Sequence, residues 1–289
     1  MRTTSVVRRS RDAVSRLIDV MHLGRDRVIG AYEIEGLVID PGPSTGMEAL
    51  LAGLEQEPRA LLLTHIHLDH AGAAGSLVRR FPGLRVYVHE AGAPHLVDPA
   101  KLLESAARLY GDDMERLWGD VLPVPEENIV ALSGGESVQG FRVAYVPGHA
   151  SHHVAYLHKD SGDAYVGDVA GVRIPPFDLT MAPTPPPDID VEAWERSLEL
   201  VADWRPRRLC LTHFERADDP LEQIDRVRDS LRRHAEIAHG GDRQRFLSEI
   251  DAELARSVDE EVALRHRQAA PSEQLWLGLE RYWRKRASE

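Results

Sequence analysis

No part of this sequence constrains the fold more than the segment HIHLDH at residues 65–70. It places four side chains of the types that commonly bind metal ions within six residues, directly after the apolar run Ala60–Thr64. A short continuous apolar run predicts a strand buried on both faces. If this strand continues into the motif, His65 and His67 share one face because side chains alternate along a strand. The last two residues of the motif, past the turn, can then reach a second ion beside the first.

The residue composition decides which ligands a metal site can use. The 289 residues include 14 histidines and a single cysteine, which excludes a disulfide framework or a zinc site built from cysteines. Any metal must therefore be held by histidine and carboxylate, ligands that suit zinc first and also iron or manganese. The 35 basic and 47 acidic residues give a net charge of −12, which disfavours nucleic acid and anionic lipid as partners.

Strand and helix patterns alternate along most of the chain and predict an α/β fold. The predicted strands are a hairpin at 28–40 and single strands at 60–64, 85–89, 141–147, 154–158, 164–167 and 208–211. The predicted helices are 47–54, 73–81 and 191–204, the last with Asp190 as its cap. Several of these strands lead directly into polar loops that contain His or Asp.

Two segments depart from this alternation and define the expected organisation. Apolar residues at helical spacing in 94–123 predict a helical cap inserted into a catalytic domain at 1–215. After residue 215 the pattern predicts helices only, so 216–289 is expected to be a helical C-terminal extension. The aromatic residues Trp276, Tyr282 and Trp283 in this extension predict a core, with a homo-oligomer interface as the alternative.

The chain also lacks the apolar segments that targeting or membrane insertion needs. Arg8, Arg9 and Arg11 interrupt the N-terminus before a signal-peptide run can form. No stretch approaches the roughly 18 apolar residues that span a bilayer. We therefore expect a soluble cytoplasmic protein without membrane partners.

At the HIHLDH motif the sequence resembles the metallo-β-lactamase-fold superfamily over residues 20–215. The resemblance implies a four-layer αββα sandwich with a metal site on loops at one edge of its two sheets. It also implies three further ligands, each placed after a strand. These positions are filled by His149 in PGHASHH, Asp168 in VGDVA and His213 in LTHF.

The resemblance implies a site for two divalent metal ions. His65, His67 and His149 would hold the first ion. The second would be held by Asp69, His70 and His213, with Asp168 bridging the pair. The resemblance specifies fold and metal far better than substrate, because the superfamily hosts many reactions on one site.

The sequence differs from three known branches of the superfamily, and these differences disfavour the activities of those branches. Asp168 stands where secreted zinc β-lactamases place a cysteine, and Cys210 lies within a predicted strand as a buried thiol. The continuation after Asp168 is shorter than in glyoxalase II, and its glutathione-binding residues find no clear match. The sequence also contains no recognisable basic segment of the kind with which the tRNA-processing nucleases of this superfamily bind RNA.

The leading hypothesis is a metallohydrolase in which a metal-bridging hydroxide attacks an ester, thioester or lactone carbonyl of a small molecule. Asp69 would orient the nucleophile, and no separate general acid can be named. A second hypothesis is a persulfide dioxygenase-like oxidoreductase with a single iron at His65, His149 and Asp168. A phosphodiesterase or nuclease on the same fold is a third, and a metal-free scaffold protein is a fourth.

Seven further residues are candidates for the site, and the sequence does not decide their roles. His152 and His153 follow a ligand and are expected behind it or in the wall of the site. His22 and His89 lie near predicted strand ends and are expected to be ordinary hydrogen-bonded histidines, whereas His95 could face the metals from the cap. The two residues expected either in the pocket wall or in loop packing are Arg173 and Phe177.

Overall fold

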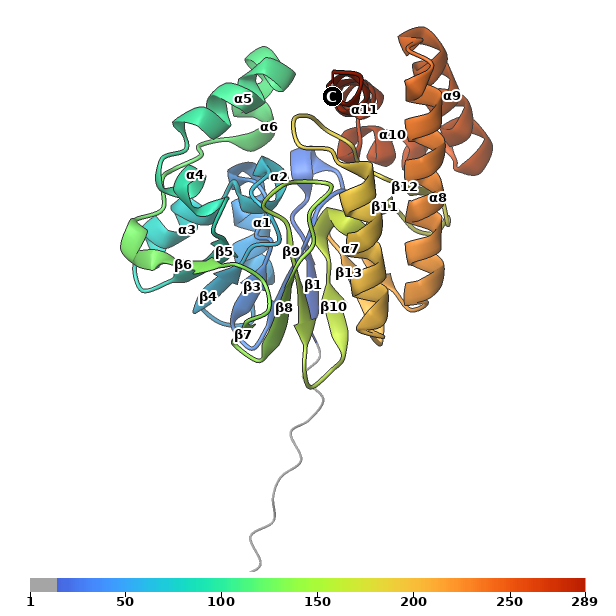
Figure 1. Ribbon diagram of the computed structural model, residues 1–289. Coiled ribbons are helices and arrows are strands. Elements are labelled where there is room, and N and C mark those ends of the chain that lie inside the picture. The colour runs from blue at the N-terminus through green and yellow to red at the C-terminus, as the bar shows by residue number, and fades with distance from the viewer. Residues whose placement is uncertain (1–14, 289) are drawn as a thin grey trace, which may run out of the picture.

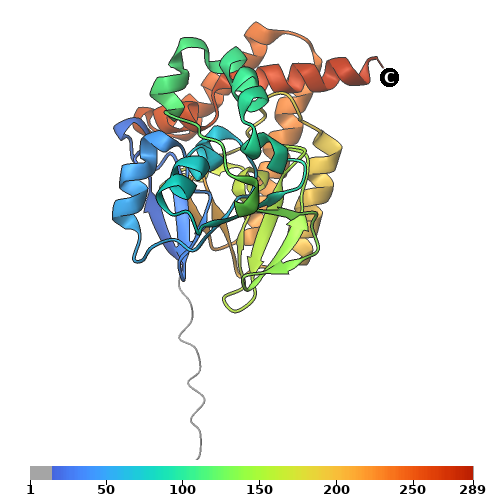
Figure 2. The ribbon, with the colours of Figure 1, turned by 90° about the vertical axis from the view of Figure 1, so that its left-hand side faces the viewer.

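The computed structural model describes residues 15–288. Two six-stranded sheets pack face to face, and helices cover both outer surfaces (Figures 1 and 2). The predicted four-layer αββα sandwich is therefore confirmed. Arg8, Arg9 and Arg11, which carried the signal-peptide argument, lie outside the described residues. Among the helices of residues 15–288, none is both long and apolar enough to cross a membrane.

The first sheet has the strand order β1-β2-β3-β4-β5-β6. Its strands are β1 (Arg16–Asp19), β2 (Gly30–Ile34), β3 (Leu37–Ile39), β4 (Ala60–Leu62), β5 (Arg85–His89) and β6 (Ile129–Leu132). The first three strands pair antiparallel, and β3 to β6 pair in parallel. Helices connect most of the parallel strands, as such crossovers require.

The second sheet has the order β14-β13-β10-β9-β8-β7. Its strands are β7 (Ser137–Val138), β8 (Phe141–Tyr145), β9 (Val154–His158), β10 (Asp163–Tyr165), β13 (Arg208–Leu211) and β14 (Glu215–Ala217). A separate hairpin pairs β11 (Val172–Arg173) with β12 (Thr180–Met181). All sheet-two pairs are antiparallel except β10 with β13.

Side chains from both sheets fill the space between them. Tyr32, Phe141, Tyr156 and Cys210 all belong to this central apolar cluster. Cys210 is 1% exposed, which confirms the prediction of a buried thiol. The hydroxyl of Tyr156 in β9 donates to the carbonyl of Leu63, just after β4, at 2.9 Å. This hydrogen bond joins the two sheets close to the HIHLDH motif.

Amphipathic helices bury their apolar stripes against the outer faces of the sheets. On the first sheet these are α1 (Met47–Gly53), α3 (Ala74–Arg80) and α4 (Ala93–Val97). On the second sheet α7 (Val191–Asp203) and α8 (Pro220–His239) take this role. Short 3-10 helices are η1 (His22–Gly24), η2 (Ser44–Gly46), η3 (Gly111–Asp113), η4 (Glu126–Asn128) and η5 (Gly167–Ala170).

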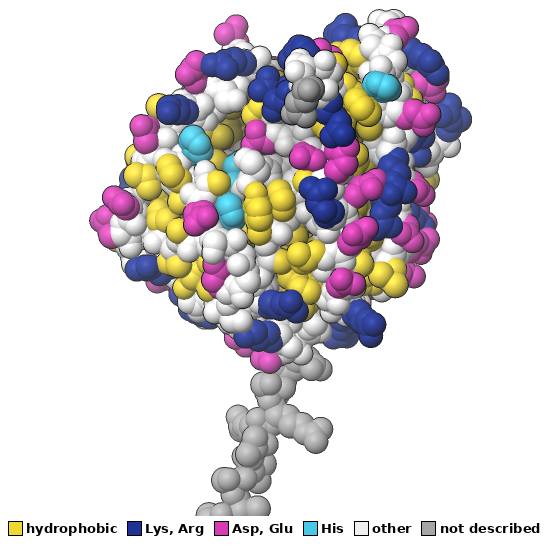
Figure 3. Space-filling view, in the orientation of Figure 1, with side chains coloured by type: hydrophobic (Ala, Val, Ile, Leu, Met, Phe, Trp, Pro, Cys, Tyr) yellow, Lys and Arg dark blue, Asp and Glu magenta, His cyan; other side chains and the backbone are white. Residues whose placement is uncertain are grey.

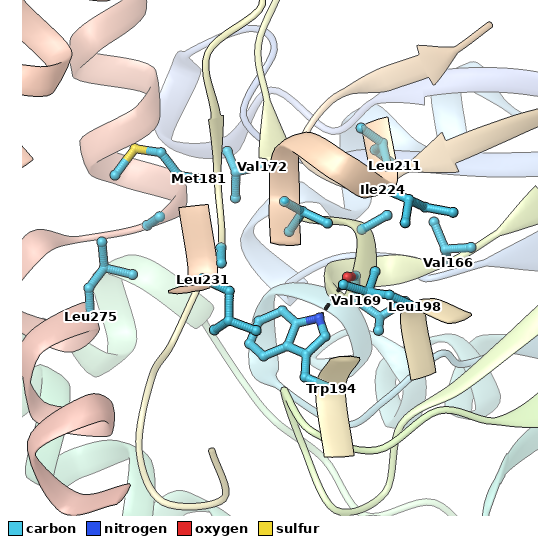
Figure 4. Packing of buried hydrophobic residues seen from close by; sticks show 14 of the residues in the cluster. Val166, Val169, Val172, Met181, Trp194, Leu198, Leu211, Ile224, Leu231 and Leu275 are labelled. Atoms are coloured by element: carbon cyan, nitrogen blue, oxygen red, sulfur yellow. Dashed lines mark hydrogen bonds between the residues drawn. The ribbon is translucent and has the colours of Figure 1, made fainter. Parts of the chain in front are cut away.

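Helix α7 illustrates how sequence and packing agree in the second outer layer. Asp190 caps the helix as predicted, since its Oδ1 accepts a hydrogen bond from the Ala193 amide at 2.8 Å. Trp194 is fully buried among apolar side chains that include Leu231 of α8 (Figure 4). Its indole Nε1 donates to the Val169 carbonyl at 2.7 Å, which satisfies the ring's polar atom.

Most of the inserted cap and the last three C-terminal helices lie above the same end of the sandwich (Figures 1 and 2). The cap comprises α4, α5 (Ala100–Tyr110) and α6 (Met114–Trp118), between β5 and β6. The C-terminal region comprises α8, α9 (Arg243–Ser257), α10 (Glu260–Ala269) and α11 (Ser272–Arg286). Trp276 and Tyr282 belong to the core and Trp283 packs against it, which confirms the core interpretation of this stripe.

The extension from residue 216 differs from its prediction in one respect. The sequence pattern predicts helices only, but β14 spans Glu215–Ala217 and pairs with β13 at the edge of the second sheet. Three residues are too few to display an alternating pattern, so the sequence gives no signal for this strand.

Candidate metal centre

The seven predicted ligands meet at one end of the sandwich, in loops that follow strands. They are His65, His67, Asp69, His70, His149, Asp168 and His213. In the second sheet β8, β10 and β13 run in the same direction, so their carboxyl ends reach the same edge. His149 follows β8, Asp168 lies in η5 after β10, and His213 follows β13. Ligand positions at the carboxyl ends of strands are the usual arrangement in such sheets.

The local structure of the motif differs from a continued strand. β4 ends at Leu62, and a loop leads from it into α2 (Leu68–Ala71), which carries Asp69 and His70. The loop, rather than strand alternation, brings His65 Nε2 within 2.9 Å of His67 Nδ1.

A first group of ligand atoms comes from His65, His67 and His149. The Nε2 atom of His149 lies 3.0 Å from Nδ1 of His67, and the three ligand atoms all lie within 4.8 Å of one another. Residues 65 and 149 are fully enclosed, whereas His67 is partly exposed. Three convergent imidazole nitrogens form a set that can hold one divalent ion.

A second group comes from Asp69, His70 and His213. His213 Nε2 lies 3.3 Å from Asp69 Oδ2. Asp168 stands between the two groups: its Oδ1 is 3.2 Å from His70 Nε2, and its Oδ2 is 3.4 Å from His149 Nε2. One carboxylate oxygen thus faces each group, which is the position a bridging ligand needs.

Several polar atoms in this cluster are buried without a hydrogen-bond partner. They are His70 Nε2, Asp168 Oδ1 and His213 Nε2. A buried polar atom left unpaired is costly, and these three converge on one another. Nitrogen and carboxylate oxygen atoms placed in this way fit divalent cations, so the residues present are suited to the metals that the sequence predicts.

Hydrogen bonds on the outer side of the histidines fix their orientation. His149 Nδ1 donates to the Pro183 carbonyl at 2.8 Å, and His213 Nδ1 donates to the Val28 carbonyl at 2.6 Å. Each bond fixes a proton on Nδ1 and turns Nε2 toward the cluster. Both imidazoles are therefore oriented to bind a metal through Nε2.

Asp40 organises three of the surrounding loops and is a site residue that the sequence alone does not identify. Its carboxylate accepts hydrogen bonds from the Thr64 amide at 2.8 Å, from the Thr64 hydroxyl at 2.7 Å and from His70 Nδ1 at 2.9 Å. The Thr212 hydroxyl is a further donor at 3.1 Å. Asp40 thus orients His70 directly and holds the residues beside two other ligands. A carboxylate ending a strand before the turn PGP is its one sequence signal.

Burial and mutual charge set the protonation states of the cluster. Burial lowers the pKa of His65, and the neighbouring His70 lowers it further. Burial raises the pKa of Asp168, but nearby His70 and His213 more than offset this and hold it well below its ordinary value. Burial lowers the pKa of His67 to about 4, with His149 contributing. Neutral imidazoles and ionised carboxylates are the forms that bind metals.

The five histidines whose roles the sequence does not decide lie behind the cluster, in the lining of a cavity, or away from both. His153 stacks on His65 with ring centroids 4.7 Å apart, and its Nε2 accepts from the Asp168 amide at 3.3 Å, so it lies directly behind the cluster. His152, His95 and His22 line the cavity described below. His89 instead stacks on Tyr145, away from that cavity.

The two other candidates for the pocket wall, Arg173 and Phe177, make packing contacts instead. The guanidinium of Arg173 donates to the Arg216 carbonyl at 3.1 Å. Phe177 packs against the large apolar cluster of the second outer layer. Neither side chain lines the cavity.

A cavity of about 690 Å³ extends from the cluster between the cap and the C-terminal helices. His67, Asp69 and Asp168 form part of its floor. Its walls come from α5 and α6, from α10 and α11, and from the proline-rich segment 183–188. A volume of this size is typical of pockets that enclose a whole small organic ligand.

A sequence profile of the family described as "Metallo-beta-lactamase superfamily" matches residues 31–213. The metallo-beta-lactamase fold-containing protein ST1585 of Sulfurisphaera tokodaii is 29% identical over 160 residues, which cover 53% of this chain and 59% of that protein. The crystal structure of ST1585 superposes with a TM-score of 0.65 at 24% identity, covering 77% of this chain and 86% of the other. This likeness extends the agreement in fold beyond the region matched in sequence.

Two further comparisons concern enzymes and metals. Hydroxyacylglutathione hydrolase of Thermosynechococcus vestitus is 31% identical over 134 residues, which cover 45% of this chain and 42% of that enzyme. The matched region thus spans less than two thirds of the length of the curated relatives. The structure of TTHA1623 in a di-iron-bound form has a TM-score of 0.50 at 27% identity and covers 70% of this chain and 88% of the other.

Proposed function

Because the chain belongs to the metallo-beta-lactamase superfamily, we propose that it is a dinuclear metallohydrolase that cleaves an ester, thioester or lactone bond of a small molecule. The observation that carries the proposal is the carboxylate of Asp168, with one oxygen toward His70 and the other toward His149. That placement suits a residue shared by two ions.

Each half of the cluster would hold one ion. His65, His67 and His149 would bind the first. Asp69, His70 and His213 would bind the second, with Asp168 as the shared ligand. Zinc is the first choice for this donor set, followed by iron and manganese. The di-iron form of TTHA1623, a relative in sequence and fold, supports the stoichiometry of two and keeps iron among the candidate metals.

Bound divalent ions would supply a water of lowered pKa and would polarise the carbonyl oxygen of a substrate. The chain itself contributes position and charge. Asp69 and Asp168 are the carboxylates of the cluster that also line the cavity. The Asp69 side chain is 21% exposed, so it can accept a hydrogen bond from the attacking water and orient that water toward the substrate. The similarity to hydroxyacylglutathione hydrolase supports hydrolysis as the reaction type.

The decisive experiment combines metal analysis with a substrate panel. Protein purified without added metal is expected to contain two zinc, iron or manganese ions per chain and to hydrolyse members of a panel of thioesters and lactones. Phosphodiesters and β-lactams serve as competing substrates in the same panel. One iron per chain with oxygen uptake would point instead to a dioxygenase.

Substitution of ligands separates the metal site from the rest of the fold. The double variant His65→Ala with His67→Ala is expected to lose metal and activity together. The control His239→Ala removes a histidine that packs against Trp283, far along the sequence from the cluster, and should change neither. Full activity in the double variant would reject the proposal and favour a metal-independent role.

A further inference from the structure

The cavity has mainly apolar walls on two opposing sides. Leu102, Leu109 and Leu117 line it from the cap, and Ala270 and Leu275 line it from the C-terminal helices. Apolar side chains that remain around a solvent-filled space are stabilised when a ligand removes them from water. A polar substrate as small as a two- or three-carbon acid would leave most of this surface exposed. The walls therefore favour a ligand with an extended apolar part.

Basic side chains also line the cavity, and three of them belong to segments that meet at His22. Arg25 lies three residues beyond His22, and Gln268, which follows Arg267, donates to the His22 carbonyl at 3.2 Å. Arg116 lies on α6 two residues before Trp118, whose ring stacks on His22. Arg25, Arg116 and Arg267 thus line the cavity from segments that meet at His22, and Lys101 lines it from the cap.

The carboxylate partners of these arginines are exposed to solvent. Arg116 pairs with Asp113 at 2.9 Å, and Arg267 pairs with Glu260 at 3.1 Å and with Asp251 at 3.7 Å, but such exposed pairs contribute little energy. Arg25 has no carboxylate within ion-pair distance among residues 15–288. Guanidinium groups donate hydrogen bonds and cannot accept them, so their natural partner is an oxyanion.

Such an excess of basic side chains is not a general feature of the protein surface. The net charge is −12, and acidic and basic side chains are interspersed over the face shown in Figure 3. Outside the metal cluster, Asp188 is the one carboxylate that lines the cavity among the described residues, and it accepts a hydrogen bond from the Ser151 hydroxyl. Outside the metal cluster, the charged part of the cavity lining is therefore mainly cationic in an acidic protein.

The segment around His22 is held in a constrained conformation. Met21 and Leu23, on either side of His22, both adopt positive φ angles, of 52° and 54°. Such angles cost non-glycine residues free energy and persist where tertiary contacts impose them, often beside ligands. The His22 ring stacks on Trp118 of the cap with centroids 5.4 Å apart and planes within 7°. This stack joins the segment around His22 to the cap.

We propose that the cavity binds an amphipathic organic anion, with an apolar chain between the cap and the C-terminal helices and a carboxylate or phosphate group at Arg25, Arg116 and Arg267. The substrate is then an acyl ester or thioester that carries such a group. The oxygen of water bonds to the acyl carbon as the C–O or C–S bond breaks, which gives a carboxylate, an alcohol or thiol, and one proton that passes to solvent. The hydrolytic part of this statement rests on the proposed function, whereas the binding part does not.

The test measures binding by calorimetry with three ten-carbon probes: decanoate, decyl phosphate and decanol. The full-length protein is used both as purified and after metal removal, so that anion binding to metal is separated from binding at the arginines. We expect at least one of the two anions to bind about tenfold or more tightly than decanol in both forms. The anion that binds better identifies whether carboxylate or phosphate is the preferred group. Equal affinity of all three probes would overturn the proposal.

A matched pair of variants assigns the preference to the arginines. The triple variant R25Q/R116Q/R267Q is expected to bind the anions no better than decanol. The control R108Q/R232Q/R284Q removes the same charge from exposed arginines that pair with Glu104, Glu195 and Glu280 outside the cavity, and it should keep the preference. Equal losses in both variants would show a general charge effect and reject the site.

Hydrolysis assays on the same proteins distinguish this inference from the proposed function. Anion binding lost only in the first variant, in a protein that hydrolyses no acyl ester, would support the cavity assignment and reject the hydrolase. Hydrolysis of neutral esters, with no preference for anionic ones and no change in the first variant, would support the hydrolase and reject the cavity assignment.

Discussion

The metal cluster and the cavity above it are built in opposite ways. The cluster draws its ligands from loops at the ends of strands, and outer hydrogen bonds such as His149 to Pro183 fix their rings. The cavity lies between two helical regions that approach from different parts of the chain. Among the described residues, one hydrogen bond joins the cap helices to the C-terminal helices, from the Tyr110 hydroxyl to Gln274 at 3.3 Å.

From this difference we expect the cluster to determine the reaction and the cavity to determine which substrates are accepted. A rigid, enclosed ligand set preserves the geometry that metal-assisted chemistry requires. Helical regions that are joined weakly can change their lining without disturbing that geometry. Changes at the cluster should therefore abolish metal binding and activity together, whereas changes at the cavity should alter substrate preference while the metals stay bound.

The largest effect is expected from Asp168→Ala. Removal of the shared carboxylate should lower the metal content below two ions per chain and reduce hydrolysis by more than the roughly 100-fold that loss of an outer partner costs. Metal analysis by mass spectrometry and steady-state kinetics would measure both. The control Asp188→Asn changes a carboxylate that lines the cavity but lies outside the cluster. Retention of two ions by Asp168→Ala would contradict the bridging role.

The next effect is expected from Asp40→Ala, which leaves the cluster residues intact. Loss of its carboxylate would remove the hydrogen-bond acceptor of His70 Nδ1. It would also leave the buried amide and hydroxyl of Thr64 without an acceptor. We expect metal affinity to fall by about 10- to 100-fold, and stability to fall by about 1–3 kcal/mol for each unpaired donor. Metal titration and urea unfolding measure the two losses.

Two companion variants make the Asp40 result interpretable. Asp40→Asn keeps one acceptor oxygen and should lose less than the alanine variant. Asp218→Ala alters an exposed carboxylate and should match the unmodified protein in both measurements. Unchanged metal affinity in Asp40→Ala would show that the ligand loops hold their positions without it.

The contrast between Asp40 and the ligands explains what the sequence could reveal. The cluster was predictable because four ligand types are contiguous at residues 65–70 and the others each follow an apolar strand. Asp40 meets its partners Thr64, His70 and Thr212 across 24, 30 and 172 residues, and no local pattern encodes such contacts. The place of His22 in the cavity wall likewise depends on tertiary packing, since its carbonyl meets Gln268 from 246 residues away.

A moderate effect is expected from Gly278→Ala, which tests how the C-terminal helices are seated. A Cβ atom at Gly278 of α11 would lie 2.0 Å from the carbonyl oxygen of Thr184, a backbone atom with little room to move. We expect a loss of stability of about 1–3 kcal/mol in urea unfolding, because α11 must shift off the segment that lines the cavity. Metal content should stay at the unmodified level.

Gly83→Ala is the matched control for this change, because nothing lies within 4 Å of its added Cβ and its backbone φ is not in the left-handed region. It should leave stability and substrate preference nearly unchanged. Loss of metal from Gly278→Ala would mean that cavity and cluster are coupled, against the separation argued above.

The smallest effect is expected from Tyr110→Phe, which removes only the hydroxyl that reaches Gln274. At 3.3 Å this hydrogen bond is long, and a typical one contributes about 0.5–1.5 kcal/mol. We expect KM to change by less than about tenfold for substrates that fill the cavity, with kcat and metal content unchanged. Tyr87→Phe removes a hydroxyl that accepts from Gln139 away from the cavity and should leave KM unaltered. A fall in kcat for Tyr110→Phe with KM constant would instead place its hydroxyl in the chemical step, so this substitution tests where the boundary between the two regions lies.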